Sequence, residues 1–397
     1  MKQLSKKASA LEASQTLALT ALALKMKSEG VDVVSLTAGE PNFPTPPHIK
    51  QAAIKAIDDD FTKYTANAGI PGLRAAIVEK FRNENNLHFD ASQILVSNGA
   101  KHSIYNALQA ICNPGDEVIF SAPYWVSYPE MVKLVDAKSV VLNTTEKTEF
   151  KITPLQLRKA ITKKTKALIL CSPSNPTGSV YSQRELEELA RVVEKTGIFV
   201  ISDEIYEKVI YDHHNHFSIG SISAIKDQVI TVNGVSKAYA MTGWRIGYFG
   251  ANHDVTAAAE KIQSQMTSNA SSISQRAALA AISGSDHDAK YMTAEFMKRR
   301  DFIYNAVCSI KGLTCIKPAG AFYLFPNVSK YFGKKYNGEP LRSSDAVSHF
   351  LLKEENLVVV PGSGFGADKF IRLSYACSME ELEKAAERMH RGFSKLG

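Results

Sequence analysis

The sequence has few cysteines and no long hydrophobic run. Five cysteines are scattered over 397 residues, and no two of them form a Cys-x-x-C pair. An odd number without such a pair argues against a disulfide framework and indicates reduced thiols in a cytosol. No apolar stretch reaches the roughly 18–20 residues that a membrane-spanning helix needs. We therefore predict a cytoplasmic chain without a membrane segment.

The sequence also lacks a large excess of one charge. It holds 47 Lys and Arg against 40 Asp and Glu, a formal net charge of +7. The basic residues form only short clusters, such as Lys298-Arg299-Arg300, and none alternates with aromatic side chains as in a base-stacking groove. No helix-turn-helix or zinc-finger spacing is present, which argues against a nucleic-acid-binding protein. A content of 45% hydrophobic and 22% charged residues is typical of a globular chain.

The length predicts two or three domain-sized units. From residue 117 onward, short apolar segments alternate with helical patterns, which is typical of an α/β protein with a parallel sheet and crossover helices. The candidate strands are residues 94–97, 118–120, 139–142, 167–170, 199–202 and 229–232. Because they are almost continuously apolar, we expect them to be buried on both faces of the sheet. We also predict a long helical tract over residues 254–283. Strands near 321–325, 357–360 and 370–374, with helices near 343–354 and 378–393, indicate a smaller α+β domain.

Polar side chains follow three of the predicted strands. Asn175 follows the strand at 167–170, Asp203 and Tyr206 follow the next, and Lys237 follows the strand at 229–232. Ligands of open α/β sheets bind beyond the carboxyl ends of the strands, so one pocket would collect these groups. A lysine can form a Schiff base with an aldehyde cofactor, and an aspartate can keep a pyridine nitrogen protonated.

Two further segments allow more than one interpretation. Residues 98–101, Asn-Gly-Ala-Lys, lie where a predicted strand meets a helix, and backbone N–H groups there could bind a phosphate. The alternative is an ordinary strand-to-helix turn with a flexible glycine. His213, His214 and His216 suggest a metal site, but no second cluster has ligand spacing. We predict that this histidine segment is a solvated loop and that no metal is bound.

Three motifs carry a resemblance to a known family. They are Ser-Pro-Ser-Asn-Pro-Thr-Gly at 172–178, Ser-Asp-Glu-Ile-Tyr at 202–206 and Val-Ser-Lys-Ala-Tyr-Ala-Met-Thr-Gly-Trp-Arg-Ile-Gly at 235–247. In this order they resemble the class I, fold-type-I pyridoxal-phosphate aminotransferases. The segments 37–41, 63–65, 122–129 and 372–375 are similar to bacterial aspartate aminotransferases of subgroup I-beta. The resemblance covers nearly the whole chain.

The resemblance implies a fold and a domain division. The fold is that of PLP-dependent transferases of fold type I, with a large, mixed, mostly parallel seven-stranded sheet, crossover helices and a smaller α+β domain. Residues 1–45 would form an N-terminal arm and part of the small domain. Residues 46–290 would form the large cofactor domain, and residues 291–397 the small C-terminal domain.

The resemblance also implies the roles of the cofactor residues. Lys237 would hold pyridoxal 5'-phosphate and move a proton during catalysis. Asp203 would pair with the ring nitrogen, Asn175 and Tyr206 would contact the ring hydroxyl, and Trp125 would stack on the ring. The phosphate would be bound by Gly99, Ala100, Lys101, Ser236 and Arg245. Tyr64 would reach it from a neighbouring subunit, which implies a homodimer with shared active sites.

For the substrate, the resemblance assigns the α-carboxylate to Arg372 and Gly39, beside Trp125 and Asn175, and a distal carboxylate to Lys101, Ser14 and Thr16. It implies ping-pong transamination of L-aspartate and 2-oxoglutarate to oxaloacetate and L-glutamate. Asn98 and Glu12 depart from the pattern of relatives, so aromatic amino acids or prephenate stay open as substrates. The alternatives are a carbon–sulfur β-lyase on the same fold and a non-enzymatic ligand-sensing protein.

Overall fold

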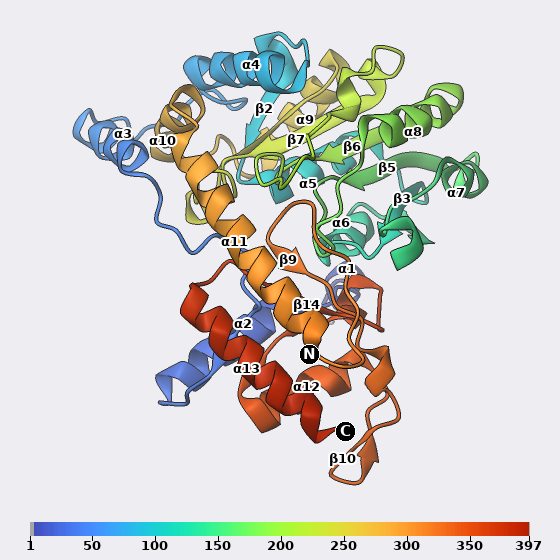
Figure 1. Ribbon diagram of the computed structural model, residues 1–397. Helices are drawn as coiled ribbons and strands as arrows, with labels where there is room; N and C mark the ends of the chain where they lie inside the picture. Colours follow the sequence, from blue (N-terminus) through green and yellow to red (C-terminus); the bar gives the residue numbers. More distant parts are fainter. Residues whose placement is uncertain (1–3, 397) are drawn as a thin grey trace.

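A computed structural model describes residues 4–396 of the chain, and a mixed seven-stranded sheet forms its upper half in Figure 1. The strand order is β2-β8-β7-β6-β5-β3-β4, and β8 is antiparallel to both of its neighbours. All other pairs are parallel. The bounds are β2 (Ile94–Ser97), β3 (Glu117–Ala122), β4 (Lys138–Asn143), β5 (Thr165–Cys171), β6 (Phe199–Asp203), β7 (Val229–Gly234) and β8 (Gly247–Gly250). The predicted fold class is confirmed.

The inner strands are apolar because helices cover both faces of the sheet. Every residue of β7 is buried, and so is every residue of β2 although it lies at an edge of the sheet, which matches the prediction from their near-continuous apolar runs. Strand β8 is also buried throughout. The prediction is wrong for β4, an edge strand whose residues are exposed or half-buried throughout. The surrounding helices are α3 (Pro47–Asp58), α4 (Pro71–Asn85), α5 (Ala100–Ile111), α6 (Ser127–Leu134), α7 (Pro154–Ala160) and α8 (Gln183–Thr196).

The predicted helical tract over 254–283 is two helices rather than one. Helix α9 (His253–Met266) ends before Ser268, whose φ of 57° is left-handed and stops the helical path. Helix α10 (Ser272–Ser283) then begins after Ser271, whose side chain accepts a hydrogen bond from the backbone N–H of Ser274. Serine is a favoured N-cap, so the break has a local cause that the apolar pattern hides.

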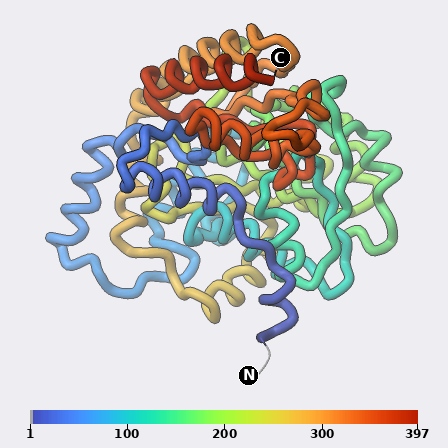
Figure 2. Tube along the Cα trace, turned by 90° about the horizontal axis from the view of Figure 1, so that it is seen from below, coloured from blue at the N-terminus to red at the C-terminus, as the bar shows by residue number. Residues whose placement is uncertain are grey.

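Segments from both ends of the chain together form the part of the molecule in the lower half of Figure 1. Strand β1 (Val34–Ser35) pairs in parallel with β12 (Leu357–Val358), and helix α2 (Gln15–Ser28) contacts β13 (Val360–Pro361). In Figure 2 the N-terminal segment, in dark blue, lies next to these C-terminal elements. The remaining elements are α1 (Lys6–Ser9), β9 (Tyr323–Leu324), β10 (Lys335–Tyr336), β11 (Glu339–Pro340), α12 (Ser344–Glu355), β14 (Ile371–Ser374) and α13 (Met379–Lys395).

One long helix connects the two halves. Helix α11 (His287–Ser309) starts beside α10 and runs down to α13, against which it packs. A three-stranded antiparallel sheet, β13-β14-β9, follows it and belongs to a core that also includes Leu36 and Phe393. This arrangement supports the division at residues 45 and 290, which stays a prediction. In residues 4–396, no helix combines the length and the apolar character needed to cross a bilayer.

Candidate active site

A cavity of about 380 Å³ lies beyond the carboxyl ends of β5, β6 and β7, where the two halves meet. Sequence positions more than 350 residues apart line it, from Ser14 to Arg372. The residues that we predicted for the site and that line the cavity are Ser14, Thr16, Gly39, Ala100, Lys101, Trp125, Asn175, Asp203, Tyr206, Ser236, Lys237, Arg245 and Arg372. The structure therefore brings together nearly the whole predicted set.

Lys237 follows β7 and reaches the middle of the cavity. Its Nζ donates a hydrogen bond to the carbonyl oxygen of Gly39 at 2.5 Å. Burial lowers the pKa of Lys237 to about 8, and the charges of Arg245 and Arg372 act in the same direction, while Glu40 opposes them. A lysine amine with this pKa is part neutral near pH 8, which suits a nucleophile and a general base.

Asp203 ends β6 and is buried. Its carboxylate accepts hydrogen bonds from the hydroxyl of Tyr128 at 2.7 Å and from the backbone N–H of Ile205 at 3.3 Å. Burial raises the pKa of Asp203, and the charge of Glu204 adds to the effect. The charge of Lys237 acts in the opposite direction and lowers this pKa, and a further cationic group in the cavity would stabilise the charged form of Asp203.

Tyr206 and Trp125 give the cavity its aromatic walls. The hydroxyl of Tyr206 lies 2.8 Å from that of Tyr323, and burial raises the pKa of Tyr206 well above its usual range. The Trp125 ring meets Tyr128 edge-on at 5.4 Å, and the Nζ of Lys101 lies 5.0 Å from its centroid. Burial lowers the pKa of Lys101, and nearby Arg245 acts in the same direction.

The N-terminus of α5 faces Arg245 at one end of the site. Helix α5 begins at Ala100 without a side-chain cap, so its first N–H groups are available to an anion. Gly99 has a φ of +89°, and a Cβ there would collide with the Arg245 guanidinium. Arg245 donates only to the carbonyl oxygens of Thr242 and Asn98, at 2.9 and 3.3 Å. Ser236 is buried at the same cavity, and the set fits a phosphate group.

Arg372 is a buried cation without a carboxylate partner among the described residues. It is 2% exposed, and it donates to Asn175 Oδ1 at 3.0 Å and to the Thr37 carbonyl at 2.8 Å. Its Nε has no hydrogen-bond partner. Burial lowers the pKa of Arg372. A planar guanidinium in this state is suited to grip a carboxylate with two parallel hydrogen bonds.

The structure leaves Gly99 and Tyr64 outside the cavity lining of this chain. Gly99 lies directly behind it, against Arg245. Tyr64 is 90% exposed in the segment between α3 and α4, where it contributes nothing to this chain's own site. Ser14 lines the cavity but also caps α2, since its hydroxyl accepts from the backbone N–H of Leu17 at 3.4 Å.

Sequence reasoning assigned no role to two tyrosines at the site. Tyr128 lies within the 122–129 motif, three residues after Trp125 and in the first turn of α6, and its place in that motif is the signal that was available. Tyr323 contacts both Tyr206 and Arg372, whose guanidinium lies 4.5 Å from its ring centroid. No motif marked Tyr323, because its place at the site depends on how the C-terminal half packs on the sheet.

Comparisons with known proteins place this geometry in a family. Residues 31–389 match the family "aminotransferase class I and II". The chain is 47% identical to the aspartate aminotransferase of Bacillus sp. (strain YM-2), over 96% of each chain. It is 46% identical to the probable aspartate/prephenate aminotransferase of Rickettsia bellii, over the full length of both chains. The aspartate aminotransferase from Thermus thermophilus, solved with maleate, superposes with a TM-score of 0.93 at 41% identity, covering 99% of this chain and 100% of that one. The chain belongs to the class I and II aminotransferases.

Proposed function

We propose that the protein is a pyridoxal-phosphate-dependent aspartate aminotransferase. It transfers the amino group of L-aspartate to 2-oxoglutarate in a ping-pong cycle, giving oxaloacetate and L-glutamate. The observation that carries the proposal is the buried guanidinium of Arg372, which has no carboxylate partner within residues 4–396. It faces the same cavity as the Lys237 amine, whose pKa is about 8. Such a pair binds an amino acid by its carboxylate and acts on the atom next to it.

The residues of the cavity fit pyridoxal 5'-phosphate. The uncapped N-terminus of α5, with Gly99, Ala100 and the backbone N–H of Lys101, would hold the phosphate together with Ser236 and Arg245. Asp203 would pair with the ring nitrogen, Trp125 would cover the ring, and Asn175 and Tyr206 would donate to its hydroxyl oxygen. When bound, the cofactor supplies an electron sink that acidifies the α-carbon of an amino acid.

The chain's own residues would then bind the substrate and move its proton. Arg372, oriented by Asn175 and Thr37, grips the α-carboxylate, and the backbone of Gly39 closes the same side. Lys237, which holds the cofactor until substrate arrives, takes the proton from the α-carbon. Its lowered pKa provides a neutral amine near physiological pH, which a solvated lysine does not.

Substrate choice depends on the far side of the cavity. Lys101, Ser14 and Thr16 line it and would bind the distal carboxylate of aspartate or glutamate. The Thermus relative was solved with maleate, which is a four-carbon dicarboxylate as aspartate is. The name of the Rickettsia relative includes prephenate, and Trp125 and Tyr128 give this cavity apolar surface for a ring. Prephenate or aromatic amino acids are therefore a second candidate substrate class.

The proposal includes a cytoplasmic homodimer with shared active sites. Tyr64 is 90% exposed, and Met266 and Ile57 are about half exposed. Tyrosine and methionine are enriched at the interfaces between protein subunits. In such a dimer, Tyr64 would reach the cofactor phosphate of the other copy and complete its site.

An absorbance titration tests the proposed function. The purified protein loaded with pyridoxal phosphate should show a visible band that aspartate or glutamate converts to the pyridoxamine form, and 2-oxoglutarate should reverse the change. Lys237→Ala should lack the band of the bound state. An unchanged band in Lys237→Ala, or no conversion by any amino acid, would contradict the assignment. Pyruvate and ammonia from a cysteine-type substrate, without an oxo-acid acceptor, would indicate a β-lyase instead.

A further inference from the structure

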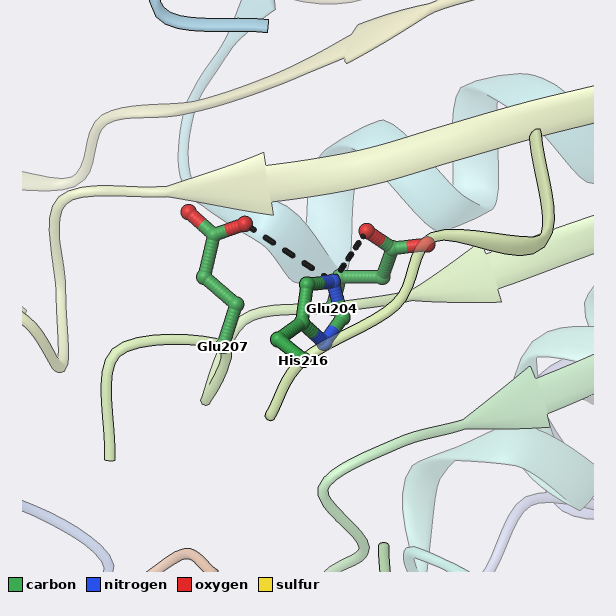
Figure 3. A group of neighbouring side chains, drawn as sticks. All are labelled: Glu204, Glu207 and His216. Atoms are coloured by element: carbon green, nitrogen blue, oxygen red, sulfur yellow. Dashed lines mark hydrogen bonds and ion pairs between the residues drawn. The ribbon is translucent and has the colours of Figure 1, made fainter. Parts of the chain in front are cut away.

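A buried charge cluster lies directly behind the proposed cofactor site. Glu204, Glu207 and His216 point toward one another in Figure 3, with one ligand atom of each within 4.8 Å of the others. The Nε2 of His216 lies 2.8 Å from Glu204 Oε2 and 3.9 Å from Glu207 Oε2. Glu204 is the neighbour of Asp203 in sequence, but only Asp203 lines the cavity.

This finding corrects the interpretation of the histidine segment as a solvated loop. His213 and His214 are exposed as predicted, but the His216 side chain is only 11% exposed. The sequence offered no signal for the difference, because the partner carboxylates come from the end of β6. The loop folds back on that strand and buries its last histidine there.

The cluster has the contacts of an ion-pair network rather than of a metal site. Glu204 Oε1 accepts from the hydroxyls of Ser202 and Ser218, both at 2.8 Å. Glu207 is in direct contact with the ammonium of Lys80 and accepts from Asn85 Nδ2 at 2.7 Å. These donors already occupy the carboxylate oxygens, and the Lys80 ammonium would repel a metal ion. The prediction that no metal is bound stays a prediction.

The network anchors the segment that carries two proposed cofactor residues. The backbone N–H of Glu204 donates to Val232 in β7 at 2.9 Å, and Glu207 ties the next turn to α4 through Lys80. Asp203 and Tyr206 alternate with these anchors along the chain. Because Asp203 and Tyr206 face the cavity while Glu204 and Glu207 are held behind it, the anchors fix the direction in which the cavity residues point.

We infer that His216, in its protonated form, is a positioning residue, which clamps Glu204 and Glu207 together and so holds Asp203 and Tyr206 in place for the cofactor. This inference rests on the proposed function, since it assumes that the cofactor binds between these two side chains. His216 itself touches neither the cavity nor the reacting atoms. It acts on the cavity residues indirectly, through its contacts with Glu204 and Glu207.

The charges around His216 balance only while it is protonated. Glu204 and Glu207 come from the segment after β6, and Lys80 comes from α4. Farther out, Glu84 of α4 lies 3.6 Å from Lys80 and 2.8 Å from the Nζ of Lys208. Two carboxylates thus face one lysine and one histidine at the centre. Loss of the histidine proton leaves Glu204 with hydroxyl donors but without a cationic partner among residues 4–396, which is costly for a buried carboxylate.

The direction of the pH effect follows from the pKa of His216. Burial alone lowers this pKa, but the charges of Glu204 and Glu207 outweigh burial and raise it above its ordinary value of 6.5. A group whose pKa is raised by folding stabilises the folded state fully below the unfolded pKa. That stabilisation disappears as the pH rises through the folded value. The clamp is therefore closed under acidic conditions and released under alkaline ones.

Cofactor affinity of His216→Gln across a pH series tests the inference. Glutamine keeps a hydrogen-bond donor but cannot carry the charge. We expect the Kd for pyridoxal phosphate, measured by quenching of tryptophan fluorescence, to rise about 10-fold at pH 6, since losing one partner of a buried ion pair is strongly unfavourable. The ratio of the two Kd values should fall toward one as the pH rises through the folded pKa of His216, because the wild-type imidazole then loses the charge that glutamine lacks.

His213→Gln is the matched control, because it removes an exposed histidine three residues away in the same loop. Its Kd should equal the wild-type value at every pH. A ratio for His216→Gln that stays constant with pH would overturn the inference and leave a purely structural role. If wild-type protein binds no pyridoxal phosphate at any pH, the proposed function fails, which is a separate outcome.

Hydrogen–deuterium exchange of the wild-type full chain tests the clamp without a variant or a cofactor. After correction for the intrinsic rate, peptides that span residues 203–218 should exchange at least several-fold more slowly at pH 6 than at pH 9. Peptides from α8 serve as the internal reference, because that helix contributes no residue to the cluster. Equal protection at both pH values would overturn the inference even if His216→Gln fails to fold.

Discussion

Two arginines are buried to the same degree but have opposite surroundings. Arg300 on α11 is fully buried, and its guanidinium contacts Asp212 at 2.7 Å and Asp301 at 2.8 Å. These carboxylates raise the pKa of Arg300 despite its burial. Arg372 on β14 is 2% exposed and has only neutral acceptors, so burial lowers its pKa.

The difference separates a structural cation from a functional one. Burying an unpaired charge costs several kcal/mol, and folded proteins rarely tolerate it without compensation. The buried charge of Arg300 is neutralised by carboxylates of the same chain. The buried charge of Arg372 is neutralised only when an anion enters the cavity. The stability that the fold gives up at Arg372 is therefore available as binding energy for a substrate carboxylate.

Arg372→Leu should have the largest effect on activity. Loss of the buried guanidinium removes the carboxylate grip, so kcat/KM for aspartate should fall about 100- to 1,000-fold, as for other buried charge pairs. The free energy of unfolding of the cofactor-free protein should not fall, because an unpaired buried charge is removed. Steady-state kinetics and chemical denaturation measure the two quantities. A large loss of stability with intact kcat/KM would reverse the assignment.

Arg300→Leu should show the opposite pattern. It leaves Asp212 and Asp301 without their cation, and the free energy of unfolding should fall by about 2 kcal/mol, less than for a fully buried pair because both aspartates are about 40% exposed. Urea denaturation gives the value, and kcat/KM at a temperature where the variant is folded should be unchanged. If activity falls as much as in Arg372→Leu, the distinction between the two arginines is wrong.

The order of strands and polar residues along the chain predicts a parallel sheet and the centre of the site, while the resemblance to a family supplies most of the other site residues. Asn175, Asp203 and Lys237 each follow a strand, so the rule that ligands bind at the carboxyl ends of parallel strands places them together. The rule cannot place Tyr323 or His216, because their positions depend on how loops and the C-terminal half pack. Nor does it distinguish Arg300 from Arg372. Arg300 follows Arg299 and precedes Asp301 in the sequence, but only the fold brings Asp212 to its guanidinium and keeps the carboxylates of the described residues away from Arg372.

Lys101→Ala should lower activity less than Arg372→Leu does, and it should do so selectively. Lys101 lines the cavity at the end opposite to Arg372's carboxylate grip in our proposal, and burial lowers its pKa, so it is less solvated than a surface lysine. A charged hydrogen bond to a distal carboxylate is worth about 1.5–3 kcal/mol. We therefore expect kcat/KM for aspartate to fall roughly 10- to 100-fold, while kcat/KM for phenylalanine, which has no distal carboxylate, stays unchanged or rises. Lys101→Arg, which keeps the charge, should recover part of the loss on aspartate. An equal loss on both amino acids would mean that Lys101 serves the cofactor phosphate with Arg245, and Arg372 would then be the one cation here that is reserved for the substrate.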